Sequence, residues 1–184
     1  MREAAWNRAL EKYPDREFER WLLQGIREGF RIGYNRSYSC TPSRRNLQSA
    51  QDNPLVVEQY QLKEMGLGRI LGPLDQCSFK NIQISLFGVI PKSQPGKWRL
   101  IVNLSSPEER SVNDGIDKPM CSLKYITVDH IVENVIRRGG RGALLRKLDL
   151  QSAFRTVPVH PEDRLLLGMS WKDQLFIESP TSVE

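Results

Sequence analysis

Residues 147–155 read KLDLQSAFR and place a carboxylate directly after a run of apolar residues. Asp149 ends a strand-like segment, and Phe154 follows five positions later. A carboxylate at a strand end can hold Mg²⁺, which prefers oxygen ligands and often binds one or two protein carboxylates together with phosphates. The same side chain can instead cap the following turn by accepting hydrogen bonds from its amides. Spacing alone favours the cap, because such short motifs match by chance, and Phe154 alone is an ordinary core residue.

A second candidate group lies upstream, in the run PKSQPGKWRL. Residues 84–92 and 98–105 are apolar or β-branched and are joined by SQPG, so they are expected to form a β-hairpin. Lys92 and Arg99 flank its turn and can bind a polyphosphate, with Arg99 suited to a bidentate contact. An ordinary solvated hairpin tip has the same composition, and without further context it is the simpler interpretation.

The remaining pattern predicts the elements that must position these residues. Helices are expected in the first 36 residues, after Pro54, and over residues 127–138, with Thr127 as N-cap and Gly139 as stop. Residues 34–54 are typical of a polar linker or surface loop. Further strands are expected over residues 143–150 and in the runs LLLGMSW and QLFIE, which the Lys172-Asp173 turn separates. The order β-β-α-β-β indicates an α+β fold with a mainly antiparallel sheet.

Composition narrows the classes of function. The chain has 184 residues, enough for one domain with or without an ordered extension, and a net charge of +5, which favours polyanionic partners. An ordinary basic surface explains that excess equally well. No apolar run resembles a signal peptide or a membrane span. Three dispersed cysteines and two histidines argue against a disulfide framework and a zinc site. We therefore expect an intracellular protein of the cytoplasm or nucleus, with no membrane partner.

Several blocks in order then carry a resemblance. GKWRLIVNLS, SVNDGI and KLDLQSAFRTVPVHPEDRLLLGMSW resemble the fingers and early palm of retrotransposon reverse transcriptases, and the DIRS-like (tyrosine-recombinase) group is the most similar. The likeness covers roughly residues 50–178. It implies an incomplete right-hand polymerase fold after a helical N-terminal extension. The implied parts are residues 1–50 (extension and polar linker), 51–142 (fingers-like region), 143–178 (beginning of the palm, motif A) and 179–184 (unmatched tail).

The resemblance also implies roles for single residues. Asp149 matches the first catalytic aspartate, a ligand of the pair of Mg²⁺ ions used by intact family members. Leu150 matches the position whose backbone carbonyl can also reach a metal. Phe154 matches the aromatic steric gate that favours deoxynucleotides. Lys92 and Arg99 match residues that contact the nucleotide's phosphates. The implied partners are an RNA template, a DNA primer and deoxynucleoside triphosphates.

One motif of the family does not occur in these 184 residues, namely an Asp-Asp pair on a tight turn. Two-metal chemistry needs carboxylates from two places. We therefore expect a fragment of an RNA-directed DNA polymerase that is inactive alone, with an unpaired strand edge and apolar surface after Asp149. The HPEDR block is assigned no chemical role, and His160 is expected to cap a helix or pack against its neighbours. A non-catalytic nucleic-acid-binding or domesticated remnant, and a gene fragment without a selected function, remain open alternatives.

Overall fold

The computed structural model describes residues 3–37, 45–74, 79, 81–121, 123–146, 148–149 and 153–179, without the side chains of Met120, Phe154 and Arg155. The α-helices are α1 (Glu3–Leu10), α2 (Arg16–Glu28), α3 (Gln48–Gln51), α4 (Pro54–Gly66), α5 (Val128–Arg138) and α6 (Ala153–Thr156). The strands are β1 (Ile70–Leu74), β2 (Ile84–Pro91), β3 (Trp98–Asn103), β4 (Gly168–Trp171) and β5 (Gln174–Glu178). Short 3₁₀ turns are η2 (Asn113–Gly115), η3 (Lys118–Cys121) and η4 (Pro161–Leu167).

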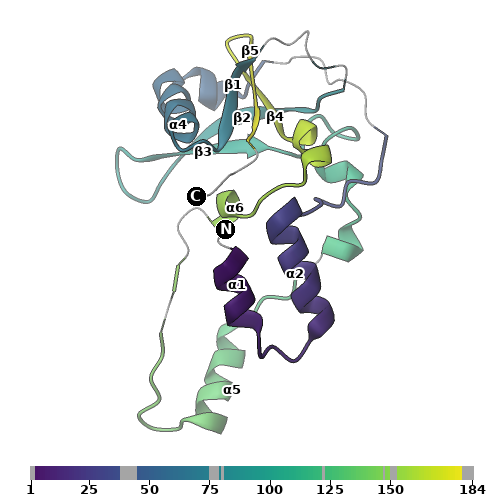
Figure 1. Cartoon of the computed structure of the whole chain (residues 1–184). Helices are drawn as coiled ribbons and strands as arrows, with labels where there is room; N and C mark the ends of the chain where they lie inside the picture. The colour runs from purple at the N-terminus through teal and green to yellow at the C-terminus, as the bar shows by residue number, and fades with distance from the viewer. Residues whose placement is uncertain are drawn as a thin grey trace.

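The strands form one five-stranded mixed sheet in the order β1-β5-β4-β2-β3 (Figure 1). β2 and β3 form the expected antiparallel hairpin. β4 and β5 form a second hairpin, whose turn residues Lys172 and Asp173 have φ angles of 48° and 61°. β1 pairs antiparallel with β5, whereas β2 and β4 run parallel. The predicted α+β class and the prevalence of antiparallel pairs are therefore confirmed.

One strand prediction is wrong, and one strand was not predicted. Residues 70–74 read ILGPL, whose glycine and proline are unusual in a strand, yet they form β1. This is permitted because β1 is an edge strand that pairs only with β5. Conversely, residues 143–150 were expected to form a strand, but the described residues 143–146, 148 and 149 form none. A strand needs a partner to complete its ladder, and this segment pairs with neither described edge, β1 or β3.

The core lies on both faces of β2, whose first six residues are buried. One face packs under α3 and α4, in a cluster of Ala50, Val57, Ile70, Phe87, Val89, Met169, Trp171 and Phe176. The other face packs against residues that include Leu165 of η4, in a cluster of Ile82, Ile84 and Leu175. Helix α4 is therefore held on the first face of the sheet.

The predicted linker over residues 34–54 is only partly a loop. Residues 38–44 lie outside the described part of the chain, but Asn46 and Ala50 are buried against the sheet. The Asn46 side-chain amide donates to the Ser170 carbonyl and accepts from the Phe87 amide, each at 2.7 Å. The ladder between β2 and β4 ends at Ser85↔Met169, so Asn46 bridges the two strands beyond that point. The polar composition predicted solvent exposure, but the amide satisfies two buried backbone groups.

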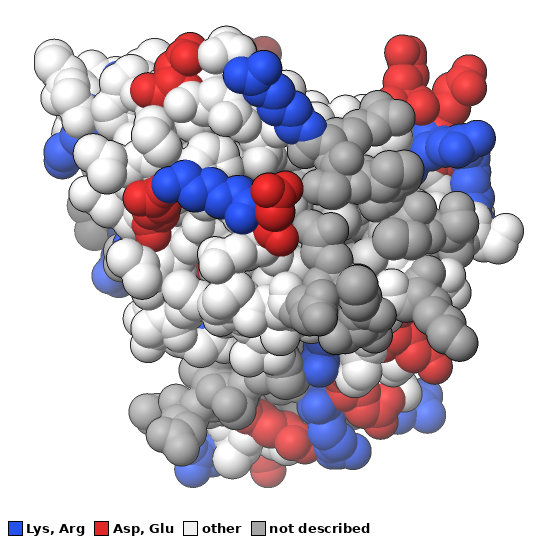
Figure 2. All heavy atoms as spheres, turned by 90° about the horizontal axis from the view of Figure 1, so that it is seen from above, with Lys and Arg blue, Asp and Glu red and all other residues white. Residues whose placement is uncertain are grey.

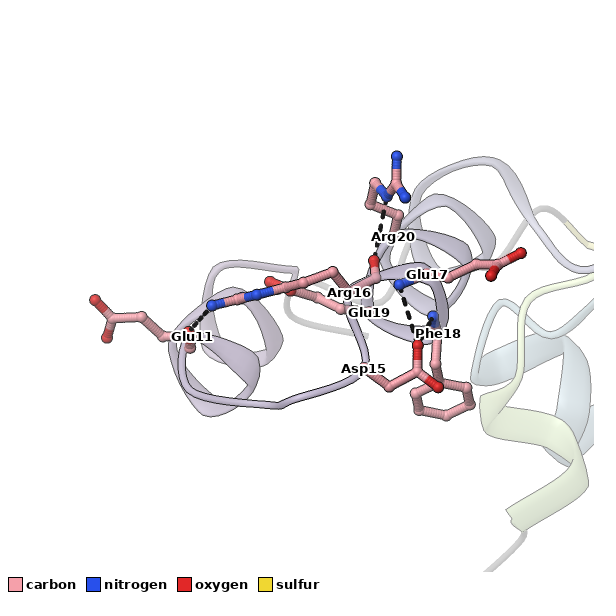
Figure 3. A network of polar contacts seen from close by, with 7 residues as sticks. All are labelled: Glu11, Asp15, Arg16, Glu17, Phe18, Glu19 and Arg20. Atoms are coloured by element: carbon pink, nitrogen blue, oxygen red, sulfur yellow. Dashed lines mark hydrogen bonds and ion pairs between the residues drawn. The ribbon is translucent and has the colours of Figure 1, made fainter.

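The N-terminal helices form as predicted, with local capping. Asp15 caps α2 by accepting hydrogen bonds from the amides of Glu17 and Phe18 at 3.1 and 2.9 Å (Figure 3). This satisfies two of the four free amides of the first turn. Close packing follows at the other end, because a Cβ atom on Gly25 would lie 2.1 Å from Cε1 of the Phe30 ring.

The N-terminal segment also joins the HPEDR block. Phe30 donates its amide to the Pro158 carbonyl at 2.8 Å and accepts from the His160 amide at 3.0 Å. Next to this bridge, the nearly buried Asp163 carboxylate accepts from the Ile32 amide at 2.8 Å and pairs with Arg31 at 2.9 Å. His160 caps η4 by accepting from the Glu162 amide at 3.3 Å, which confirms its predicted capping role.

Helix α5 also forms as predicted but leaves its apolar side open. Thr127 and His130 form a reciprocal capping box, and Gly139 follows the last helical residue. Val128, Ile131, Val132 and Ile136 are nevertheless exposed. None of the helices in the described part of the chain is long and apolar enough to span a bilayer.

Candidate functional site

A cavity of about 990 Å³ lies between α4, the β2–β3 hairpin and the segment that precedes β4. Its apolar lining continues the face of the sheet that α4 covers, through Leu100, Val102 and Met169. Its polar lining is formed by Tyr60, Lys63, Glu64, Lys92, Arg99, Asp149, Glu178 and Ser179. The cavity thus combines an apolar surface with several charged groups, as ligand sites commonly do.

Three of the residues that the sequence singled out line this one cavity, namely Lys92, Arg99 and Asp149. The hairpin positions the first two. The Lys92 amide donates to the Lys97 carbonyl at 2.8 Å and closes the turn, and Arg99 pairs with Ile90 in the ladder. Neither cation forms an ion pair with a carboxylate of the described residues. Both charges are therefore available to an anionic ligand.

Asp149 is exposed and lies at the end of the irregular segment 143–149, before α6 in the chain. Within the described residues, no group of three or more His, Cys, Asp and Glu side chains is arranged to hold a metal ion. A two-ion centre needs carboxylates from more than one place, so the described donor set does not fit one by itself. Asp149 is one carboxylate in a cavity, not a formed metal centre.

The other two predicted site residues lie wholly or partly outside the described part of the chain. Leu150 lies outside the described residues. Phe154 belongs to α6, but its side chain is not described, so its role as a steric gate remains a prediction. The first residue of α6, Ala153, lines the cavity, and this places the helix at the cavity wall.

The acidic side chains of the cavity differ in their surroundings. Glu64 is 4% exposed and pairs with Arg69 at 3.5 Å, and its Oε2 atom has no hydrogen bond. Its charge is thus largely balanced within the protein. Asp149 is exposed, and Glu178 lies in β5 next to Ser179, whose amide donates to the Arg69 carbonyl at 2.9 Å. The charge left in the cavity is mixed, with cations on the hairpin and on α4.

Sequence reasoning missed the contribution of α4, which supplies Tyr60 and Lys63 to the cavity. A lysine in the last turn of a helix is favoured by the helix dipole wherever it points. Its type and position therefore gave no functional signal. Trp98 was missed as well, although it precedes Arg99 and is 42% exposed at the cavity.

Charge elsewhere is dispersed. On the face in Figure 2, seen from above the sheet, basic and acidic side chains are interspersed. One such pair joins α4 to the second hairpin, with Lys172 Nζ 2.6 Å from Glu58 Oε1. This contact lowers the pKa of Glu58 through a hydrogen bond and the charge of Lys172. The net charge of +5 is therefore not gathered on that face.

No protein-family model and no curated protein matches this sequence. Among solved structures, the native prototype foamy virus protease-reverse transcriptase is similar at a TM-score of 0.48 and 14% identity, over 100% of this chain and 25% of that one. The foamy viral enzyme in complex with double-stranded DNA is similar at a TM-score of 0.46 and 13% identity, over 98% and 32%. Its complex with an RNA/DNA hybrid gives 0.45 and 11%, over 100% and 25%. The chain thus spans a quarter to a third of the length of these proteins.

Proposed function

We propose that the chain is part of an RNA-directed DNA polymerase of retroelement origin, comprising the fingers and the beginning of the palm. One observation carries the proposal. Arg99 and Asp149 belong to separate sequence blocks of the reverse-transcriptase pattern, Lys92 lies beside Arg99 in the same hairpin, and all three line one cavity. The hairpin explains why Lys92 and Arg99 are neighbours, but local structure does not explain why Asp149 from a distant block joins them. The ordered blocks favour retrotransposon enzymes of the DIRS-like group as the source.

The proposed roles follow from charge and position. Lys92 and Arg99 bind the phosphates of a deoxynucleoside triphosphate, because both are cations without a described carboxylate partner beside the cavity. Asp149 supplies one of the carboxylates for a pair of Mg²⁺ ions, and Phe154 limits the sugar to the deoxy form. The nucleic-acid partners are an RNA template and a DNA primer.

These residues alone are not expected to polymerise. The sequence contains no Asp-Asp pair, and the described carboxylates do not form a metal-binding group. Without further carboxylates, the positions of two ions cannot be fixed. Primer extension on a primed RNA template with Mg²⁺ or Mn²⁺ should therefore yield no product from the purified chain, and robust incorporation would contradict this expectation.

The proposal itself is tested by adding an Asp-Asp turn, which these 184 residues do not contain. A fusion of the 184 residues to a palm segment that carries an Asp-Asp turn should extend the primer, and Asp149→Asn in the fusion should abolish extension while template binding stays intact. Glu11→Gln, which also replaces an exposed carboxylate by an amide of equal size, is the control. A fusion that binds template and is equally active with Asp149→Asn would refute the catalytic assignment.

A non-catalytic nucleic-acid-binding function is the second candidate, and the hairpin cations Lys92 and Arg99, which have no carboxylate partner among the described residues, favour it. Both functions predict that binding to primed template weakens with salt, since each neutralised phosphate releases counterions. Arg99→Gln should reduce the salt slope by about 1 if Arg99 contacts a phosphate. Arg8→Gln, at an exposed helical position, should leave the slope unchanged. Binding without extension by the fusion would favour this second function.

A further inference from the structure

Helix α4 carries three charged residues, and two of them are already neutralised within the protein. Glu58 pairs with Lys172 at 2.6 Å, and Glu64 pairs with Arg69 at 3.5 Å. These pairs attach α4 to the β4–β5 turn and to the start of β1. Lys63 is the remaining charge, is exposed, and has no ion-pair partner among the described residues. Among the described residues, the helix therefore presents one cation without an ion-pair partner.

That cation lines the same cavity as Lys92 and Arg99. The hairpin cations come from the edge of the sheet beyond β2, whereas Lys63 comes from a helix packed on the sheet's face. Two different elements thus contribute three cations to the lining of one cavity, and none of the three has a carboxylate partner among the described residues. Asp149 and Glu178 also line the cavity, and their carboxylates offset part of the attraction that the cations exert on an anion. A ligand with several negative charges close together, which can contact all three cations, is therefore favoured over a simple monoanion.

We propose that Lys63 is a third phosphate-binding residue of this cavity, and that α4 and the β2–β3 hairpin bind a nucleoside triphosphate between them. The inference rests on the proposed function and extends it to a residue that no sequence block marks. Three cations around one cavity suit a polyphosphate, in which several charged oxygens lie close together.

The size of the cavity favours one small ligand over a polymer. Its volume of about 990 Å³ falls within the range typical of sites that enclose a single ligand. The apolar surface formed by Leu100, Val102 and Met169 can cover the base and sugar, while the cations bind the phosphates. A nucleic-acid strand would instead be tracked by an extended basic groove.

Affinity for deoxyadenosine triphosphate, measured by NMR titration of the full chain, tests the proposal, with deoxyadenosine as the uncharged comparison. Lys63→Gln should weaken binding of the triphosphate about tenfold, the worth of one charge-assisted hydrogen bond. Lys63→Arg should retain most of the affinity because the charge stays. Lys12→Gln, at an exposed lysine away from the cavity, is the control. Deoxyadenosine should bind the wild type and Lys63→Gln equally weakly.

The outcomes separate this inference from the proposed function. If Lys92→Gln and Arg99→Gln weaken triphosphate binding but Lys63→Gln does not, the role of Lys63 is refuted and the proposed function stands. If the wild type binds primed template but no triphosphate, the ligand assignment is refuted. An equal loss of triphosphate affinity in Lys63→Gln and Lys12→Gln would show that only the net charge of the protein matters. That result would also overturn the proposal.

Discussion

At the scale of single residues, Asn46 shows how a polar side chain can substitute for a strand. It lies in a stretch whose composition is that of a loop, yet it is buried and joins β2 to β4 where their ladder has ended. Its amide provides both a donor and an acceptor, which the two strands need at Ser170 and Phe87. The side chains of similar size do not offer both groups, since an ionised Asp lacks the donor and Leu lacks both.

Asn46→Ala should therefore destabilise the fold by about 2–4 kcal/mol, because it leaves a buried amide and a buried carbonyl without partners. Urea unfolding followed by circular dichroism measures the change. Gln48→Ala is the matched control, since Gln48 is exposed and its side-chain amide donates to the nearby Asp52 carboxylate rather than to a buried strand. A free energy of unfolding within about 0.5 kcal/mol of the wild type for Asn46→Ala would contradict the role assigned to the amide.

A second residue-scale prediction concerns Asp114 in the SVNDGI block. Its carboxylate accepts hydrogen bonds from Ser111 Oγ at 2.6 Å and from the Ser111 amide at 3.0 Å. These bonds, the side-chain one first, hold the pKa of Asp114 below its ordinary value of 3.8. Since the folded pKa lies below the unfolded one, the contribution to stability is present above pH 3.8 and is lost as the pH falls through the folded value.

Ser111→Ala should raise the pKa of Asp114 toward 3.8, because it removes the larger of the two causes. Carboxyl NMR shifts followed against pH report this value directly. Ser93→Ala, in the exposed hairpin turn, should leave the titration of Asp114 unchanged. An Asp114 pKa that stays equally low in Ser111→Ala would show that the hydroxyl is not its cause.

At the scale of elements, the N-terminal helices are attached to the sheet domain through a short seam. Residues 30–32 pair with residues 158–163 by backbone hydrogen bonds and by the Arg31–Asp163 ion pair. Asp163 is 2% exposed, whereas the Arg31 side chain is 54% exposed. The pair raises the pKa of Arg31 above its ordinary value, chiefly through its hydrogen bond to Asp163. The buried carboxylate thus depends on a partner from the other element.

Substitution of Arg31 should increase local opening of the seam more than it increases global unfolding of the domain. In Arg31→Gln, the amides of Phe30 and His160 should exchange with solvent about tenfold faster, because Asp163 keeps only the Ile32 amide as a described donor. Hydrogen exchange resolved by residue measures this, and Arg20→Gln, at an exposed arginine of α2, is the control. Unchanged exchange at Phe30 would show that backbone pairing alone holds the seam.

At the scale of the whole molecule, the described residues leave apolar surface open around α5 and the segment that leads to Asp149. Leu144, Leu145 and Leu148 are 99%, 73% and 74% exposed. The first two line a second hollow of about 400 Å³ together with Ile131 and Val135 of α5. Contiguous apolar surface of this kind binds hydrophobic dyes, whereas single exposed leucines do not.

The double substitution Leu144→Gln with Leu145→Gln should lower the fluorescence of bound anilinonaphthalene sulfonate and change the free energy of unfolding by less than about 0.5 kcal/mol. Both effects follow because the two side chains contribute to surface and not to the core. Leu55→Gln, at an exposed leucine of α4 that does not line this hollow, is the control and should leave the dye signal unchanged. Loss of stability comparable to that of a core truncation would show that these leucines pack in solution.

The sequence by itself determined the elements whose causes are local. The helix at α5 has its cap, its stop and its 3.6-residue period within its own residues, and the two hairpins carry their turns between them. The order of the blocks also determined the family resemblance and the candidates Arg99 and Asp149, and spacing within the predicted hairpin added Lys92. Each of these inferences depends on neighbours along the chain, which a single sequence displays.

Only the tertiary structure decided what depends on distant partners. β1 forms despite its glycine and proline because β5 offers it an edge, while residues 143–149 have a strand-like pattern but no described strand to pair with. Burial of Asn46 requires the gap between β2 and β4. Lys63 enters the cavity because packing of α4 and two ion pairs hold it there. Ladder pairing, burial and convergence of charge depend on residues far apart in sequence, and local propensity carries no record of them.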